Sequence, residues 1–313
     1  MNKPRDFTDT LRQNTEAEIA RIAAYAQGEV GVVARHLGNG LELAVAVDDH
    51  YPPASAVKMP LAAKLLDMVD RGDIKLSDMI EVRESEMNPA GPLGDEFPHA
   101  GIALSVANLL EITITRSCNT ATDVLFRVVG GPAKVTEYLK RVGIDDFSVQ
   151  RTMRVALGVL HEIPLPPDNV SMRDFLRTQS HEVLDARNRT HANYQHDQRD
   201  LAKPTAMLEL LTRIWNGELL KPATRQLLLE IMSRTKTGDN RFRARLPQGV
   251  PFASKSGSGA GTAVDVGYVT LPLNRGTVAA GVFVKCSPLT MAEREAVVAD
   301  IGRLVYDYYM IAG

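Results

Sequence analysis

The chain has 313 residues, of which 44% are hydrophobic and 24% are charged, and its formal net charge is −2. This length and composition are typical of a globular protein with one large core or two lobes. The near balance of charge gives no basis for binding nucleic acid or an anionic membrane, and no apolar run is long enough to cross a bilayer.

The first part of the chain predicts a helix followed by two strands. Apolar residues recur at helical spacing over residues 8–27, and a glycine follows them. Two runs of strand-forming residues, 30–37 and 41–47, flank a Gly-Asn-Gly turn at 38–40. This combination predicts a β-hairpin.

The middle of the chain, from residue 55 to about 211, is predicted to be mostly helical. Its clearest helical segments are 55–71, 105–115, 120–129 and 132–142. Beyond residue 255 the pattern changes to two strands and a last helix, at 263–271, 277–285 and 291–310.

Together these elements predict an α/β (α+β) fold. Because sequential strands usually neighbour one another, the five predicted strands are expected to form one antiparallel sheet, with the first and last helices packed on it. We expect residues 1–52 and 202–313 to form this sheet lobe together and residues 53–201 to form a helical lobe. The cleft between two such lobes is a common place for a binding site.

A serine and a lysine, Ser55 and Lys58, stand three positions apart at the start of a predicted helix. Residues at this spacing share one helix face. A serine hydroxyl becomes a good nucleophile when a neighbouring base takes its proton, and a lysine serves if burial and a nearby cation favour its neutral form. The residues after Lys58 are apolar nearly all round, which predicts a buried helix with Ser55 at its mouth.

Two further motifs complete the parts of an acyl-transfer site. Residues 117–119, Ser-Cys-Asn, supply a second hydroxyl and an amide, and residues 255–257, Lys-Ser-Gly, supply a cation on a strand. Residues 236–238, Lys-Thr-Gly, have the same pattern as the second motif. They follow a helical stretch, 223–232, and lead into polar residues, so we interpret them as a turn at a helix end.

In these motifs the chain resembles the class A β-lactamases and, more loosely, the penicillin-binding proteins, which share Ser-x-x-Lys, Ser-x-Asn and Lys-Ser/Thr-Gly. Arg199-Asp200 followed by Pro204 resembles the end of the omega loop of that family, and residues 290–294 resemble the start of its last helix. The resemblance covers nearly the whole chain except about residues 148–198. It implies a β-lactamase/transpeptidase-like fold and a serine hydrolase that opens a β-lactam amide.

The resemblance implies roles for the motif residues in the helical part. Ser55 would be the acylated nucleophile and Lys58 its proton acceptor. Ser117 would pass a proton to the leaving nitrogen, and Asn119 would hold the substrate amide.

The same resemblance assigns the substrate strand. Lys255, Ser256, Gly257 and Ser258 would line it, with Lys255 and Ser256 binding a substrate carboxylate and the N–H groups of Ser55 and Ser258 forming the oxyanion hole. Arg241 is a further candidate, because some class A enzymes carry a carboxylate-binding arginine at this place. A solvated loop arginine is the alternative.

The chain departs from the family at the residue that positions the deacylating water. The family has a Glu-x-x-Leu-Asn motif whose glutamate does this, and that position falls near Met153, where no carboxylate stands. The stretch 148–198 is longer than the family's by roughly thirty residues and resembles an insertion. Within it Glu182 is the nearest substitute and Glu162 the other, while an exposed helix glutamate is the alternative for both.

The inserted stretch also contains His181, His191, His196 and Asp197. The histidine spacing fits no helical ligand pair, so we expect no metal and no cofactor. We further expect a small-molecule substrate, no nucleic-acid or membrane partner, and a monomer.

The N-terminus and the cysteines bear on the compartment. Residues 1–6 contain no apolar stretch, which predicts no signal peptide and a cytoplasmic protein as written, or a periplasmic or secreted one if an export signal was removed. Cys118 and Cys286 do not make a disulfide framework, so we expect free thiols, with Cys118 acting as a small buried apolar residue.

Three functions therefore stay open. The first is a β-lactamase working through an acyl-enzyme on Ser55. The second is a DD-peptidase or esterase-like acyl-transferase with Lys58 as the general base. The third is a covalent penicillin-binding sensor that does not turn over. The extent of the resemblance favours the first, and the missing glutamate favours the other two.

Overall fold

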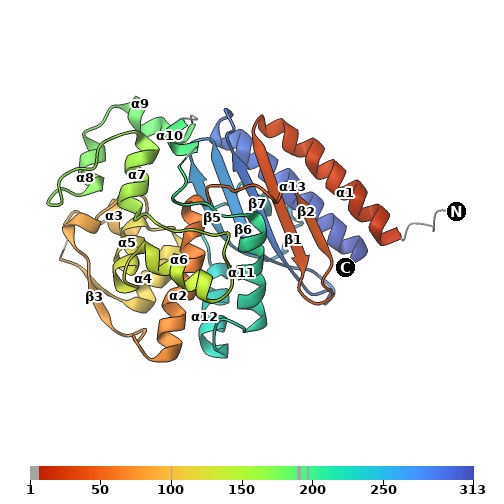
Figure 1. Ribbon diagram of the computed structural model, residues 1–313, viewed down its shortest axis with the longest axis horizontal. Coiled ribbons are helices and arrows are strands. Elements are labelled where there is room, and N and C mark those ends of the chain that lie inside the picture. Colours follow the sequence, from red (N-terminus) through yellow and green to blue (C-terminus); the bar gives the residue numbers. More distant parts are fainter. Residues whose placement is uncertain (1–6, 100, 189–191, 196) are drawn as a thin grey trace.

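The structure is a computed structural model that describes residues 7–99, 101–188, 192–195 and 197–313. A central sheet stands between two long helices on one side and a larger group of helices on the other (Figure 1). This is the predicted α/β arrangement, and the prediction of a single antiparallel sheet of five strands is confirmed.

The sheet has the spatial order β2-β1-β7-β6-β5, with every neighbouring pair antiparallel. The strands are β1 (Glu29–His36), β2 (Glu42–Val45), β5 (Phe252–Gly259), β6 (Thr262–Thr270) and β7 (Thr277–Lys285). Strands β6 and β7 are buried along nearly their whole length because helices cover both of their faces. Strand β5 lies at the edge of the sheet, which leaves it next to the cleft.

Alternate residues of the strands enter two different cores, as the two-residue repeat of a strand requires. Val32 and Val282 pack with α13 (Met291–Ala312) and α1 (Phe7–Ala23) on one face. Val33 and Phe283 belong to the other core, with α11 (Pro204–Asn216). The helices that cover the sheet therefore come from both ends of the chain and from its middle.

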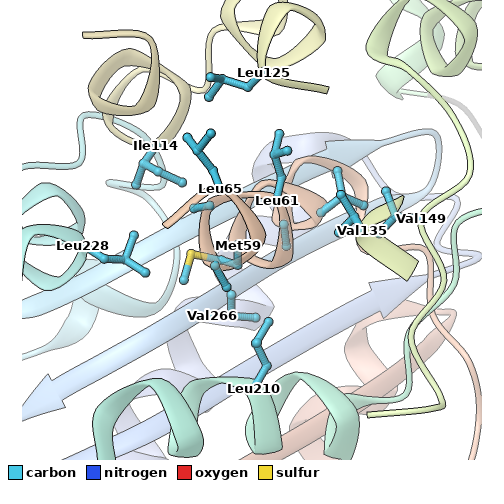
Figure 2. Packing of buried hydrophobic residues seen from close by; sticks show 14 of the residues in the cluster. Met59, Leu61, Leu65, Ile114, Leu125, Val135, Val149, Leu210, Leu228 and Val266 are labelled. Carbon is cyan, nitrogen blue, oxygen red and sulfur yellow. The ribbon is translucent and has the colours of Figure 1, made fainter. Parts of the chain in front are cut away.

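Helix α2 (Lys58–Arg71) lies at the centre of the helical part. Figure 2 shows Met59, Leu61 and Leu65 of this helix surrounded by apolar side chains of other helices and of the sheet. The surrounding elements are α4 (Val106–Thr115), α5 (Asn119–Val128), α6 (Pro132–Arg141), α11 and α12 (Pro222–Ser233). Because α2 is enclosed in this way, the residues at its start are held rigidly.

Smaller elements complete the helical part. They are β3 (Met79–Glu81), β4 (Ala103–Ser105), α3 (Pro92–Asp95) and the 3-10 turn η3 (Glu84–Glu86). A further 3-10 turn, η5 (Phe242–Arg245), packs against α13 instead. Strands β3 and β4 form a separate two-stranded sheet.

The inserted stretch is folded rather than extended. It contains α7 (Met153–His161), α8 (Met172–Arg177), α9 (His181–Leu184), the 3-10 turn η4 (Asp185–Asn188) and α10 (Ala192–Gln195). A third apolar cluster, which includes Leu157, Leu160, Met172 and Tyr194, holds these helices together. Hydroxyl N-caps begin three of them, at Thr152, Ser171 and Ser180.

Several predicted boundaries shift by a few residues. The first helix ends at Ala23 and is followed by η1 (Ala24–Ala26), after which Gln27 takes a left-handed conformation with φ +51°. The helix predicted from Ser55 begins as a 3-10 turn, η2 (Ala54–Val57), before α2 starts at Lys58. Within the described ranges no helix combines the length and apolar character needed to span a membrane. The division into lobes at residues 53 and 201 stays a prediction.

Candidate active site

Ser55 lies in η2, the single 3-10 turn that leads directly into α2. The turn packs closely against β5. A Cβ atom at Gly257 would lie 2.5 Å from the carbonyl oxygen of Pro53 and 3.0 Å from the backbone nitrogen of Ser55. Only glycine permits so close an approach of two backbones. Strand β5 therefore lies directly against η2, the turn that carries Ser55.

Lys58 follows Ser55 by one turn, and its side chain is fully buried. Its ammonium group donates hydrogen bonds to the carbonyl oxygen of Ser117 at 2.7 Å, the Ser117 hydroxyl at 3.1 Å and the amide oxygen of Asn119 at 2.8 Å. Ser117 and Asn119, which hold this nitrogen, both line the cleft together with Ser55.

Ser117 lies in the loop between α4 and α5 and has a φ of +52°. This left-handed conformation is uncommon for a residue with a Cβ and is typical of functional sites. It places the Ser117 hydroxyl oxygen 3.1 Å from the nitrogen of Lys58 and 3.0 Å from that of Lys255. One hydroxyl therefore connects the two lysines predicted from separate motifs.

Lys255 belongs to β5, is fully buried, and also donates to the carbonyl oxygen of Ser256 at 2.7 Å. Burial holds the pKa of Lys255 well below its usual value, and the positive charges of Lys58 and Arg241 lower it further. The negative charge of Asp265 opposes this shift. An anionic substrate group would favour the charged form of Lys255 for the same electrostatic reason.

Thr237 also belongs to the site, although the sequence analysis placed it in a turn. Lys236-Thr237-Gly238 does follow the end of α12, as predicted. The loop nevertheless returns to β5, where the Ser256 hydroxyl donates to the Thr237 hydroxyl at 2.8 Å. Two sequence features pointed to this residue: the repeated Lys-Ser/Thr-Gly pattern, and the resemblance of residues 237–239 to the family's segment before its catalytic strand.

Arg241 is not a solvated loop arginine, because its side chain is only 3% exposed. Its guanidinium donates to the carbonyl oxygens of Gly257 at 2.7 Å and Val264 at 2.9 Å, and to the Ser258 hydroxyl at 2.5 Å. It also pairs with Glu295 at 3.1 Å. Arg241 therefore holds β5 in place through these hydrogen bonds, and it also lines the cleft beside Ser256.

The cleft has two arms that meet at Ser55, Asn119 and Ser258. The further described lining residues of the polar arm are Ala90, Arg116, Ser117, Thr237, Gly238, Arg241 and Ser256. The other arm has a largely apolar wall: Pro52, Ala54, Val57, Arg151, Met153, Ala156, Leu157, Leu160, Tyr194 and Asp200. Ser55 therefore separates a hydrogen-bonding, cationic space from an apolar one.

Met153, near which the sequence analysis expects the family's water-positioning glutamate, lines the apolar arm with Ser55. Among the described residues of this wall, Asp200 is the only carboxylate. Its oxygens accept hydrogen bonds from the Arg151 side chain at 2.5 Å and from the Gln150 backbone N–H at 2.7 Å. These bonds hold Asp200 in a structural ion pair, so it is poorly placed to activate water.

The structure does not support the prediction that Glu182 positions a water molecule. Glu182 is exposed on α9 and is not part of the cleft wall. Glu162, the other alternative, is an exposed residue at the end of α7 whose carboxylate accepts a hydrogen bond from Asn193. Neither glutamate belongs to the described wall of the cleft around Ser55.

Among the residues described, no group of histidine, cysteine and acidic side chains could hold a metal ion. Two of the histidines considered as ligands, His191 and His196, lie outside the described residues. Both cysteines are free thiols. Cys118 is fully buried, and burial raises the pKa of its thiol.

The fold and the arrangement of these side chains define a serine acyl-transfer enzyme of the class A type. A family model described as "Beta-lactamase enzyme family" matches residues 14–309. The chain belongs to this family, as the sequence analysis predicted.

Individual relatives agree with this assignment. The chain is 24% identical to Beta-lactamase VEB-1 of Pseudomonas aeruginosa, over 97% of this chain and 93% of that protein. A solved β-lactamase from Chitinophaga pinensis DSM 2588 is 30% identical, with a TM-score of 0.76 over 94% of this chain and 98% of its own. The ancestral (GNCA) class A β-lactamase is 28% identical, with a TM-score of 0.77 over 94% and 99% of the two chains.

Proposed function

We propose that this protein is a serine hydrolase that opens β-lactam amides through an acyl-enzyme on Ser55. The observation that carries the proposal is the position of the Ser117 hydroxyl, which lies within hydrogen-bonding distance of both Lys58 and Lys255. All of these groups come from one chain, so the site is compatible with a monomer acting on a small molecule.

Acylation begins with attack of the Ser55 hydroxyl oxygen on the substrate carbonyl carbon. Two buried ammonium groups around one hydroxyl repel each other, which favours a state of the pair with one proton fewer. Neutral Lys58 then accepts the Ser55 proton, and the N–H groups of Ser55 and Ser258 stabilise the oxyanion. Ser117 relays the proton from Lys58 to the leaving nitrogen, so the C–N bond breaks without free charge on nitrogen.

The polar arm binds the anionic part of the substrate. Ser256 and Thr237 offer hydroxyl groups there, and Lys255 supplies charge when a carboxylate is present. Asn119, whose amide oxygen is held by Lys58 and whose nitrogen donates to Pro89, contributes to holding the acyl amide. These contacts support the substrate-binding roles given to the motif residues.

Deacylation is the step of this mechanism that we expect to be slow. In the described wall of the cleft, a methionine replaces the water-positioning carboxylate and Asp200 is held by Arg151. We therefore expect the acyl-enzyme to persist longer than acylation takes. This same observation favours a second candidate, an esterase-like acyl-transferase or covalent sensor in which Lys58 is the only base.

Intact-protein mass spectrometry with a chromogenic cephalosporin tests these proposals in one tube. Ring opening over many turnovers, with an adduct on Ser55 during turnover, is expected for the hydrolase. A lasting stoichiometric adduct without turnover would favour the sensor or transferase. Adduct formation or ring opening in Ser55→Ala would contradict the whole scheme, and replacement of the exposed Ser233 at the end of α12, Ser233→Ala, is a matched control.

A further inference from the structure

Arg116 lies at the mouth of the polar arm, beside the group proposed to protonate the leaving nitrogen. It caps the end of α4, and its side chain is exposed and lines the arm. The next residue is Ser117, which is half-buried and whose hydroxyl lies between the two lysines. Arg116 therefore occupies the outer part of the arm on the side of the leaving group.

The charge of Arg116 is not used by another part of the protein. Among the residues that the structure describes, no acidic side chain pairs with its guanidinium. Glu111, the acidic residue of α4, binds Arg234 at 2.8 Å, and the described lining of the polar arm includes no carboxylate. The guanidinium can therefore pair with an anionic group of a ligand.

The inner cations of the same arm have a different setting. Lys255 is fully buried and donates to Ser117 at 3.0 Å, and Arg241 is held by Glu295 and by carbonyl oxygens of the sheet. These two cations serve an anion that enters deeply. An anion that pairs with Arg116 would be a second one, nearer to solvent.

A backbone hydrogen bond fixes the edge of the arm at which Arg116 lies. The N–H of Lys236 donates to the carbonyl oxygen of Thr115 at 2.7 Å, which joins the loop that carries Thr237 to the end of α4. The side chain of Lys236 is exposed, so it adds a second positive charge to this edge. The positive potential at the mouth thus comes from two chain segments.

Another part of the wall leaves room for a substituent. Ala90 lines the arm with a single methyl group, and its φ is +67°. Its N–H and that of Gly91 donate to the Asp95 carboxylate at 3.1 and 2.9 Å, and its carbonyl oxygen accepts from the N–H of Asn119 at 3.1 Å. This loop is therefore fixed, with no large side chain at residue 90 to fill the mouth.

We propose that Arg116 forms an outer anion subsite, and that the enzyme favours substrates whose leaving part carries a second anionic group besides the carboxylate assigned to Lys255 and Ser256. The inference rests on the proposed acylation of Ser55 and adds no bond-forming step. Carboxylate, sulfonate and phosphate groups all present oxygen atoms that a guanidinium binds through two N–H groups. Because the subsite is exposed, its contribution is modest and weakens with salt.

Cefamandole and cefonicid are a matched pair of substrates for this test. They share the acyl group and the ring carboxylate, and they differ in the tetrazole on the leaving side, which carries methyl in cefamandole and sulfomethyl in cefonicid. The ratio of their second-order rate constants for Ser55 adduct formation, followed by mass spectrometry, measures the preference for the second anion. We expect cefonicid to react about two- to fivefold faster at low salt, the range of an exposed ion pair.

Three changes should alter this ratio in a defined way. Arg116→Gln keeps a long polar side chain without the charge and should bring the ratio close to one, and Arg116→Glu should bring it below one. A rise in salt from about 0.01 M to about 1 M should also remove the preference, because the screening length falls from about 30 to about 3 Å.

Two controls separate a local subsite from the overall charge of the protein. Arg303→Gln removes the same charge from α13, where Arg303 is exposed and pairs with Asp307, and it should keep the wild-type ratio. Carbenicillin and benzylpenicillin differ by a carboxylate on the acyl side, which faces the apolar arm. Their ratio should not change in Arg116→Gln.

The outcomes distinguish this inference from the proposed function. A wild-type cephalosporin ratio near one at low salt, an equal fall in Arg303→Gln, or an equal fall for the two penicillins overturns the outer subsite even though Ser55 is acylated. The dissociation constants of both cephalosporins for Ser55→Ala, measured by calorimetry, report the subsite without acylation. A preference for cefonicid there that is lost when Arg116→Gln is added would support the subsite even if wild-type Ser55 formed no adduct, a result that would overturn the proposed function alone.

Discussion

Replacing Met153 with glutamate tests whether a missing carboxylate limits deacylation. Met153 is 7% exposed and lines the apolar arm beside Ser55. Its position is well defined, because its backbone N–H donates to the buried carboxylate of Asp123 at 2.5 Å at the start of α7. A carboxylate at residue 153 would therefore enter the space from which water must attack the acyl-enzyme.

The size of the effect follows from two opposing terms. A positioned general base contributes about 10²–10⁴-fold to rate, so we expect Met153→Glu to speed acyl-enzyme hydrolysis by at least about 100-fold. Loss of a buried methionine costs about 1.5–3 kcal/mol, and burial of a carboxylate adds to this. Arg151 in the same wall offsets part of the second cost, so the free energy of unfolding should fall by about 2–4 kcal/mol.

The assay follows decay of a preformed Ser55 acyl-enzyme by mass spectrometry after excess substrate is removed. Met153→Gln is the control, since it has the shape and polarity of glutamate without its basicity. Equal decay in wild type and in a folded Met153→Glu would refute the idea that position 153 limits deacylation. Equal acceleration by glutamine would show that polarity, rather than a base, was lacking.

Three further perturbations address other parts of the site. The pKa of Lys255 is lowered, so its positive charge is lost as pH rises through a range well below the usual lysine value. In that range the inhibition constant of a small aliphatic carboxylate should rise with pH. The KM of an uncharged ester should not change there. Gly257→Ala should reduce acylation by about 100-fold or more, measured as the rate of adduct formation, because its methyl group would displace Pro53 from β5; an unchanged rate would contradict the close approach. Arg151→Met should lower the free energy of unfolding by about 3–5 kcal/mol in chemical denaturation, because it leaves Asp200 buried and unpaired, and a loss below 1 kcal/mol would mean that the pair is solvated.

Short-range patterns carried most of the predictable information. The strands and most helices could be predicted because their apolar residues repeat at the spacing of their own element, and a cap or turn residue marks many ends. Ser55 and Lys58 are neighbours on one turn, so their spacing alone predicted that they share the cleft. The pairing of neighbouring strands in the sequence was expected, whereas the contact of β1 with β7, which sets the order of the sheet, joins distant segments.

The parts that could not be predicted depend on contacts between distant segments. Thr237 reaches Ser256 because a loop turns back onto β5, and a local pattern cannot show this. The burial of Arg241 depends on the far side of the same strand and on Glu295 of α13. The role predicted for Glu182 likewise depends on distant contacts, since α9 is a short helix without a buried residue and its sequence does not show which way it faces.

The inserted stretch can be long without disturbing the catalytic groups because its two ends are held together. Arg151 and Asp200 stand 49 residues apart, yet their side chains meet at 2.5 Å. Near them, the backbone N–H of Ser148 donates to the carbonyl oxygen of Leu201 at 2.8 Å.

Because the two ends are held together, each extra residue between them adds little to the entropic cost of closing the loop. The extra residues can also build their own apolar cluster. That cluster supplies Leu157, Leu160 and Tyr194 of the wall of the apolar arm. The lengthened stretch and the methionine at residue 153 therefore act in the same direction: both replace a water-binding surface beside Ser55 with packed carbon.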